Sequence, residues 1–189
     1  MRLLVLALLV VSSGAFAQHS GFRWARHFER SSGFPIGLGF GPYVGALRTD
    51  LQGWGVVGRD YEVSCDRVST SCGVALLRSK GWSRGDSGGA LLHSESALPW
   101  RGVKISLRGE LRAGAVAQRA SLVVLVYGAD GKVLTSARSE PLTGTTSYGW
   151  QRVTLIVPDG AEKLSVGVEL VGAGAVFVRE VSFDEADVT

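Results

Sequence analysis

The sequence predicts an all-β fold, built as an antiparallel sandwich or barrel. Stretches in which apolar and polar residues alternate recur along the chain, as they do in strands with one buried face. The common turn formers Gly, Pro, Asp and Ser separate these stretches. After the first 17 residues, no segment repeats apolar residues at helical spacing over three turns, so we expect almost no helix.

Residues 1–17 have the organisation of a secretory signal peptide. Arg2 supplies the basic start, residues 3–11 form an apolar run, and Ala15-Phe16-Ala17 fits the cleavage pattern. We therefore expect a secreted or periplasmic protein whose mature chain, residues 18–189, forms one domain. The apolar run is too short to span a membrane, and no later segment is long enough. Arginine outnumbers lysine and asparagine is absent, a composition typical of a GC-rich bacterial genome.

The charge of the chain argues against a nucleic-acid partner. The formal net charge is +3, and removal of Arg2 with the signal peptide lowers it further. Such a small excess gives little attraction for a polyanion such as DNA. We expect no nucleic acid partner, no membrane span and no cofactor.

The two cysteines, Cys65 and Cys72, are predicted to form a disulfide. An oxidising compartment favours the bond, and closing this short loop contributes about 2–3 kcal/mol in the chain-entropy model. The alternative is a metal site or a reactive thiol. Two cysteines without a nearby histidine make a poor zinc site.

Strands are predicted in order along the second half of the chain. Residues 103–108, 153–157 and 163–170 alternate and should each have one face buried and one in water. Residues 121–127 form a continuous apolar run suited to a strand covered on both faces, and residues 129–132 read as a hairpin turn. The glycine-rich stretch 33–58 predicts long loops and short edge strands.

The string Gly85-Asp86-Ser87-Gly88-Gly89 resembles the surroundings of the nucleophile in chymotrypsin-like proteases. That family needs a histidine and an aspartate before the serine in the chain. The upstream histidines, His19 and His27, lack the family's context, and His93 follows Ser87. The resemblance covers five residues only, so we disfavour the protease and expect a turn that leads into a strand.

A longer resemblance runs along most of the mature chain. Residues 100–109 resemble the "Y-R-G-K-R-V-R-L-S-G" strand of carbohydrate-binding modules, and Thr145-Thr146 with Trp150-Gln151 is similar to their "T-T-D-W-Q". Further matches are His27-Phe28-Glu29 to the first strand, Leu170 to Gly174 to "L-x-G-x-G", and Phe177 to Phe183 to the closing strand. The order of these pieces is that of galactose-binding-like jelly rolls, which are attached to secreted glycosidases and to some bacterial tail-specific peptidases.

The resemblance implies an antiparallel jelly-roll β-sandwich and non-catalytic recognition of carbohydrate. The sequence departs from the family at Arg179-Glu180, where the closing strand usually carries Asp-Asp for a structural calcium. An arginine there can replace the cation with its own charge, and Glu29 alone provides half a site. We therefore expect no bound metal.

The candidate ligand residues are aromatic and charged, because sugars stack on aromatic faces and their hydroxyls need polar partners. Trp82, in a polar turn, and Trp100, after Pro99, are predicted to contact ligand. Trp54 and Trp150 are predicted to be structural, and Trp24 fits either role.

Arg108 and Glu110 lie on the polar face of the 103–112 strand, together with Lys104 and Arg112. We predict that Arg108 and Glu110 bind sugar hydroxyls. The alternative for this face is a cross-strand ion pair in water.

Three functions follow from these observations. The first is recognition of a carbohydrate or cell-envelope glycan without catalysis. The second is an envelope domain that binds a protein or has a structural role and has no sugar site. The third is an enzyme that uses Ser87, and we disfavour it.

Overall fold

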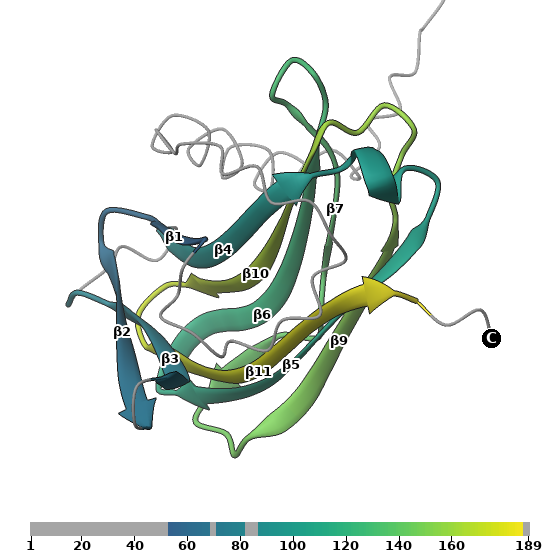
Figure 1. The fold of residues 1–189 in the computed structure, drawn as a ribbon. Helices are drawn as coiled ribbons and strands as arrows, with labels where there is room; N and C mark the ends of the chain where they lie inside the picture. The colour runs from purple at the N-terminus through teal and green to yellow at the C-terminus, as the bar shows by residue number, and fades with distance from the viewer. Residues whose placement is uncertain (1–52, 69–70, 82–86, 187–189) are drawn as a thin grey trace, which may run out of the picture.

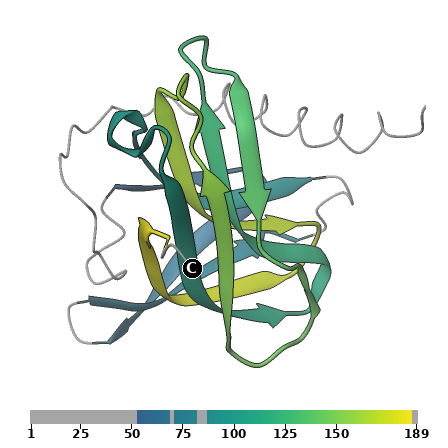
Figure 2. The ribbon, with the colours of Figure 1, turned by 90° about the vertical axis from the view of Figure 1, so that its right-hand side faces the viewer.

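The structure is a computed structural model that describes residues 53–68, 71–81 and 87–186. Of the residues singled out in the sequence, residues 1–17, His19, Trp24, residues 27–29 and Trp82 lie outside these ranges, as does most of the glycine-rich stretch. The described residues form two antiparallel sheets that pack as layers of a sandwich (Figures 1 and 2). The predicted β-sandwich is therefore confirmed.

The six-stranded sheet has the order β1-β4-β10-β6-β7, with β8 paired to β6. Its strands are β1 (Trp54–Val57), β4 (Gly88–Ser96), β6 (Val116–Tyr127), β7 (Val133–Arg138), β8 (Leu142–Gly144) and β10 (Lys163–Val171). The five-stranded sheet has the order β2-β3-β11-β5-β9. Its strands are β2 (Tyr61–Val68), β3 (Ser71–Ser79), β5 (Lys104–Gly114), β9 (Gly149–Ile156) and β11 (Ala175–Glu185). A single 3-10 turn, η1 (Leu98–Trp100), is the only helical segment in these ranges.

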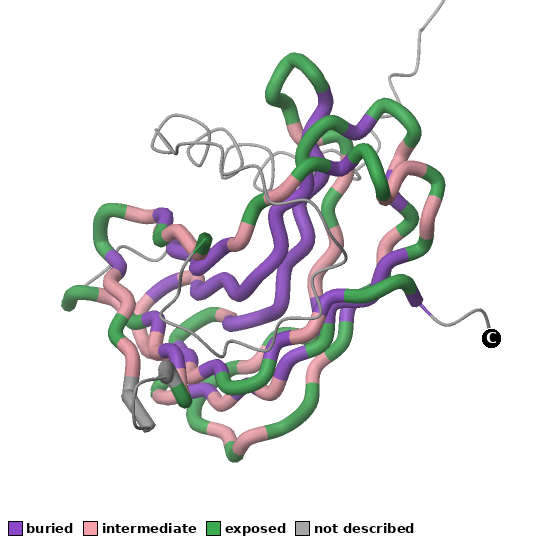
Figure 3. The backbone as a smooth tube through the Cα atoms, viewed as in Figure 1, coloured by how far each residue is buried: buried purple, intermediate pink, exposed green. Residues whose placement is uncertain are grey.

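The core lies between the two sheets and follows the predicted alternation. On β5, Ile105 and Leu107 point inward and are fully buried, while Lys104 and Arg108 are exposed. Ser106, which the alternation places in water, is instead buried, and Arg152 Nε donates to its Oγ at 3.0 Å. Figure 3 shows the buried positions gathered along the strands that face each other across the sandwich. Burial of one apolar side chain of this size stabilises the fold by about 1.5–3 kcal/mol. This alternation fixes the outward face on which β5 presents its polar side chains.

The central strands β6 and β10 are buried on both faces. All residues from Ala120 to Tyr127 are buried, as predicted for that apolar run. The prediction for β10 was wrong, because Ser165, Gly167 and Glu169 are buried instead of facing water. Their face belongs to a second apolar cluster, composed of Val57, Ala90, Leu92, Val123, Leu125 and Tyr127. Serine and glycine are small enough for such a layer, and the carboxylate of Glu169 is neutralised by partners. In the sequence alone, the same three residues indicate a strand face exposed to solvent.

The predicted hairpin turn connects β6 to β7. Asp130 Oδ1 accepts a hydrogen bond from the Lys132 N–H at 3.0 Å, and Gly131 between them has a φ of 73°. Positive φ is accessible to glycine at little cost, and an Asp side chain that bonds two residues onward stabilises such turns. The local sequence is therefore sufficient to close this hairpin.

The protease-like string leads into strand β4, as predicted from its last residues. Ser87 immediately precedes β4, and residues 82–86 lie outside the described ranges. His93 lies six positions after Ser87 along the extended chain of β4, a span of about 20 Å. Because a serine and its general base must lie within hydrogen-bonding distance, these two residues do not form a catalytic pair.

Tyr61 explains why the string contains glycine. A Cβ placed on Gly89 would lie 2.6 Å from Tyr61 Cβ and would overlap the Tyr61 ring. The Tyr61 hydroxyl lies 2.8 Å from the carbonyl oxygens of both Ser87 and Gly172. The tyrosine thus holds the start of β4 and the turn after β10 together, and the glycine provides the space for its ring.

Trp54, on β1, packs against the main core and lies tilted over His93, with 5.8 Å between ring centroids. This position agrees with its predicted structural role. Cys65 and Cys72 lie on the paired strands β2 and β3, where Cys65 pairs with Ala75 and Cys72 pairs with Arg67. The side chain of Cys72 is outside the description, so the disulfide stays a prediction. Within the ranges that the structure describes, no helix is long and apolar enough to cross a bilayer.

Substitution of Gly89 tests the role of the string. We expect Gly89→Ala to lower the free energy of unfolding by about 1–3 kcal/mol or more, because its methyl group overlaps the Tyr61 ring. Chemical denaturation measures the loss. Gly149→Ala is the matched control, since a Cβ there has no atom within 4 Å. Equal stability of the two variants would contradict the packing role of Gly89.

Candidate functional site

The outward face of the five-stranded sheet carries most of the exposed polar and aromatic side chains that the sequence singled out. In the register of β5 and β9, Glu110 lies opposite Trp150 and Arg108 lies opposite Arg152. Directly paired residues point to the same face of a sheet. The four side chains therefore share one surface, with Arg112 two residues further along β5.

The loop before β9 is anchored to the end of β5. The Ala113 N–H donates to Thr146 Oγ1 at 3.0 Å, and the Thr146 N–H donates back to the Ala113 carbonyl oxygen at 3.1 Å. The Ala115 N–H donates to Thr145 Oγ1 at 3.1 Å. These bonds hold Tyr148 beside Arg112, whose guanidinium carbon lies 5.2 Å from the Tyr148 ring centroid.

A bulge in β11 brings a second arginine to the same ring. The register between β11 and β5 shifts between Val178 and Val181, which leaves Arg179 and Glu180 outside the regular ladder. The Arg179 guanidinium lies 4.2 Å from the Tyr148 ring centroid. Glu180 has a φ of 45°, a left-handed conformation that is unfavourable for a residue with a Cβ. Bulges of this kind re-aim side chains and are frequent beside functional sites.

Arg179 is neutralised by Glu110. Its Nε and Nη2 donate to the two carboxylate oxygens of Glu110 at 2.5 and 2.9 Å, a bidentate pair. Hydrogen bonding by Arg179 lowers the pKa of Glu110, and the same contact raises the pKa of Arg179. Glu110 therefore stays ionised through the neutral range, although its side chain is only 14% exposed.

Arg112 is held by stacking and has no carboxylate partner within the described ranges. Its guanidinium carbon lies 3.9 Å from the Phe177 ring centroid, with Tyr148 on another side. Its Nε is buried and has no hydrogen-bond acceptor. Stacking on two rings fixes the plane of a guanidinium without using its terminal donors.

The exposure of Trp150 contradicts the prediction that this residue is structural. Its side chain lies on the outward side of β9, and the residue is 61% exposed. The alternation of β9 carries the signal, since Trp150 shares its parity with Arg152 and Thr154, while Val153 is buried. We call the surface formed by Glu110, Arg112, Tyr148, Trp150, Phe177 and Arg179 the aromatic–arginine face.

The predicted ligand residues are divided between this face and other places. Arg108 is exposed beside the aromatic–arginine face, and Glu110 is part of it. The ion pair of Glu110 is the cross-strand pair that we considered as the alternative, and its partner is Arg179. Trp82 lies outside the described residues. Tyr148, Arg112 and Arg179 were not predicted to bind ligand, because only the anchored loop and the bulge bring them together.

Trp100 lies at a different place and is engaged within the fold. Its Nε1–H donates to Glu95 Oε1 at 2.8 Å, and its ring meets Phe183 edge to face at a centroid distance of 4.7 Å. It is half-buried against the main core. Burial raises the pKa of Glu95, and the Trp100 bond and the nearby His93 offset this only in part. The N–H of Trp100 is therefore already engaged within the fold, and its ring is partly covered by Phe183.

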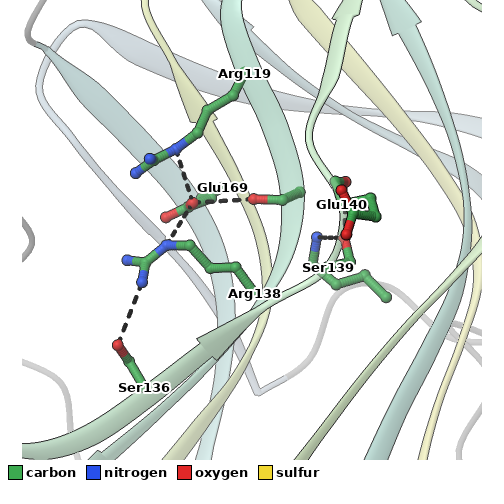
Figure 4. A network of polar contacts seen from close by, with 8 residues as sticks. Arg119, Ser136, Arg138, Ser139, Glu140 and Glu169 are labelled. Carbon is green, nitrogen blue, oxygen red and sulfur yellow. Dashed lines mark hydrogen bonds and ion pairs between the residues drawn. The ribbon is translucent and has the colours of Figure 1, made fainter.

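A second polar centre lies on the opposite sheet around Glu169 (Figure 4). The Glu169 side chain is 0% exposed and its Oε1 lies 2.8 Å from Arg138 Nε and 3.2 Å from Arg119 Nε. Ser121 donates a third contact at 3.0 Å, and Ser136 accepts from Arg138 at 3.3 Å. Glu169 is fully buried and its charge is met by Arg119 and Arg138, so we assign the centre to the support of β10 and not to ligand binding. Among the described residues, no group of three or more His, Cys, Asp or Glu side chains is arranged to hold a metal.

No protein-family model matches this chain. An uncharacterized HTH-type transcriptional regulator, YbfP of Bacillus subtilis (strain 168), is 28% identical over 148 residues, which cover 75% of this chain and 50% of that protein. The chain thus spans half the length of this curated relative. A match at this identity does not assign the chain to a family.

Solved structures show the fold more clearly. The C-terminal family 22 carbohydrate-binding module of Clostridium thermocellum Xyn10B is 10% identical with a TM-score of 0.53, and the alignment covers 78% of this chain and 96% of that one. This chain shares the β-sandwich fold of that module. The tandem CBM22-1–CBM22-2 domain of Paenibacillus barcinonensis Xyn10C gives 11% identity and a TM-score of 0.58, over 84% of this chain and 48% of that one. The CBM22-1–GH10 fragment of Clostridium thermocellum Xyn10B is 9% identical with a TM-score of 0.58, and the alignment covers 76% of this chain and 28% of that one.

The Glu95–Trp100 contact gives a pH-dependent prediction. Because the folded pKa of Glu95 is raised, ionisation of Glu95 costs stability as the pH rises from the usual carboxyl range through the folded pKa. Gln retains an acceptor for Trp100 without the buried charge. We therefore expect Glu95→Gln to raise the melting temperature by a few degrees at pH 8.

The same variant should match the unsubstituted protein near pH 3, where Glu95 is protonated. Thermal unfolding followed by circular dichroism at both pH values measures the difference. Glu185→Gln, an exposed carboxylate at the end of β11, is the control and should show no such pH-dependent gain. A gain of equal size at both pH values would contradict the electrostatic cause.

Proposed function

We propose that this chain is a non-catalytic carbohydrate-binding module and that its glycan binds on the aromatic–arginine face. The observation that carries the proposal is the exposure of Trp150 beside fixed polar groups. An exposed tryptophan is costly to hydrate and is common at recognition sites. Its flat ring provides the apolar surface on which a pyranose stacks.

The polar neighbours of Trp150 supply the hydrogen bonds that a sugar needs. Glu110 accepts, while Arg108 and Arg152 in the next paired row donate. Glu110 is held ionised and oriented by Arg179, so it is arranged before a ligand arrives. Preorganised groups lose little entropy on binding. Arg108 and Glu110 therefore keep the ligand role predicted from the sequence.

The structural neighbours support this class of function. The Xyn10B fragment of similar fold was crystallised as a complex with xylohexaose, and another neighbour is described as a xylan-binding domain. Because identity to these proteins is so low, and one fold hosts many ligands, their xylan specificity is not transferred to this chain.

Two other functions receive less support. A helix–turn–helix needs two packed helices, whereas the described ranges contain one 3-10 turn of three residues, so we do not extend DNA binding from YbfP to them. A protein-binding domain would favour a flat apolar patch. The exposed large apolar residues of the described ranges are dispersed over β1, η1, β7 and β9. The separation of Ser87 from His93 supports the absence of protease activity.

The role of Trp150 can be tested against a matched control. We expect Trp150→Ala to weaken glycan binding about tenfold or more, because it removes the stacking surface. Ile156→Ala removes a side chain of similar exposure (64%) from the other end of the same face of β9, and it should leave binding unchanged. A glycan array followed by calorimetry on the best ligand measures both, with melting temperatures recorded to confirm folding. Binding that survives in Trp150→Ala would exclude this face.

We further propose that the protein is secreted after cleavage behind Ala17 and that Cys65 and Cys72 form a disulfide. The register supports the bond only in that it places both cysteines at the same end of the β2–β3 pair. Intact-mass spectrometry of exported protein should show a chain that begins at Gln18 and is two hydrogens lighter than its reduced form. A chain that retains residues 1–17, or alkylation of both thiols without reduction, would contradict these two proposals separately.

A further inference from the structure

We infer that the aromatic–arginine face selects acidic glycans, whose sugars carry carboxylate or sulfate groups, over neutral ones. The inference rests on the proposed function and specifies the ligand class of the same site. It is based on the imbalance between arginines and carboxylates around Trp150, and on how firmly two of those arginines are positioned.

The first observation is the charge of the outward face. The basic side chains on β5, β9 and the β11 bulge are Lys104, Arg108, Arg112, Arg152 and Arg179. The acidic side chains of β5, β9 and β11 are Glu110, Glu180, Asp184 and Glu185, and Glu185 pairs with Ile105, whose side chain points inward. Glu110 is already engaged by Arg179, so the remaining basic groups exceed the remaining acidic ones. Excess positive charge attracts and orients an anionic ligand.

The second observation is the arrangement of Arg108 and Arg152. They are directly paired across β5 and β9, and like charges in such pairs destabilise a sheet. The third residue of this row, on β11, is Ser182, which brings no negative charge. Arg152 donates through Nε to Ser106 Oγ at 3.0 Å and contacts no carboxylate within the described ranges. Arg152 thus lies opposite another cation and has no carboxylate contact of its own in the described ranges, an environment that an anionic group of a ligand stabilises.

The third observation is the state of Arg112. Phe177 and Tyr148 hold its guanidinium in place, and its Nε is buried without an acceptor. Because the protein covers Nε, only the terminal Nη groups of Arg112 can meet a ligand. A planar, fixed guanidinium also matches the paired oxygens of a carboxylate or a sulfate. A neutral hydroxyl supplies neither the charge nor the paired oxygens.

These groups lie on both sides of the stacking surface. Trp150 pairs with Glu110, while Arg112 and Arg108 lie two residues away along β5 in opposite directions. The two arginines are therefore separated by about 13 Å of strand, with the tryptophan beside its midpoint. A polymer that stacks one ring on Trp150 places neighbouring acidic sugars toward Arg112 on one side and Arg108 and Arg152 on the other. The face thus fits a chain that carries repeated negative charges.

The test compares the full chain against four polymers by affinity electrophoresis and calorimetry. They are polygalacturonate, with carboxylates, dextran sulfate, with sulfate esters, unsubstituted xylan, which is neutral, and poly-glutamate, an anion without sugar. We expect either or both acidic glycans to bind at least tenfold more tightly than xylan and poly-glutamate. The two acidic arms distinguish carboxylate from sulfate recognition.

Variants assign the selectivity to the face. Arg152→Gln and Arg112→Gln should each weaken binding of the acidic glycan about tenfold, because each removes a charged donor. Arg78→Gln, an exposed arginine of β3 that is paired with Glu62, is the matched control and should have no effect. Arg152 is exposed, so its variant remains informative if Arg112→Gln fails to fold.

The outcomes separate the inference from the proposed function. Xylan bound as tightly as the acidic glycans, with loss in Trp150→Ala only, would overturn the acidic selectivity and leave a carbohydrate-binding face. Equal binding of poly-glutamate, insensitive to Trp150→Ala, would also overturn the inference, since simple charge attraction would then explain it. No binding to any glycan would overturn both.

Discussion

The burial of strand β10 on both faces is the constraint on which the rest of the sandwich depends. β10 pairs with β4 on one side and β6 on the other, and it places its apolar side chains against the five-stranded sheet. Its other face lies in the second apolar cluster and carries Glu169. A buried carboxylate is tolerated only with partners, and Arg119, Arg138 and Ser121 provide them from β6 and β7. The charge at the centre of one sheet therefore fixes which residues its neighbours must carry.

The two sheets have different roles. The six-stranded sheet holds its polar groups inside, where they bind one another. The five-stranded sheet holds its polar groups outside, and its arginines are only partly neutralised by neighbours. Polar side chains that form hydrogen bonds or ion pairs within the fold stabilise it, whereas side chains with unused donors are available for recognition. Glu169 binds Arg119, Arg138 and Ser121 through Oε1, although its buried Oε2 has no hydrogen-bond partner in the described part of the chain. Arg112 has no carboxylate partner there at all.

The sequence alone was sufficient for the fold, because strand periodicity and turn residues are local signals. The Asp130–Gly131 turn formed as predicted, and so did the alternation along β5 except at the buried Ser106. β10 was misjudged because serine, glycine and glutamate at alternate positions normally indicate water, and the burial of Glu169 depends on arginines from β6 and β7. Such tertiary compensation leaves no trace in the spacing of residues.

The candidate site was predicted only in part for the same reason. Arg108 and Glu110 follow from the parity of one strand. Trp150 was assigned to the core because it opens a strand, although the parity of β9 points it outward. Tyr148 and Arg179 required knowledge of a loop bonded to Ala113 and of an irregularity in β11. Trp100, chosen for its place after a proline, has its N–H engaged by Glu95.

The irregularity in β11 has a consequence for how this surface can change over evolutionary time. Arg179 and Glu180 stand outside the ladder, so neither residue supplies a core side chain or sets the register of the strands beside it. Substitutions at these two positions alter the chemistry of the face while the apolar residues on either side, Val178 and Val181, stay buried. Ligand preference and folding are thereby encoded at separate positions, and one scaffold can acquire new specificities without being rebuilt.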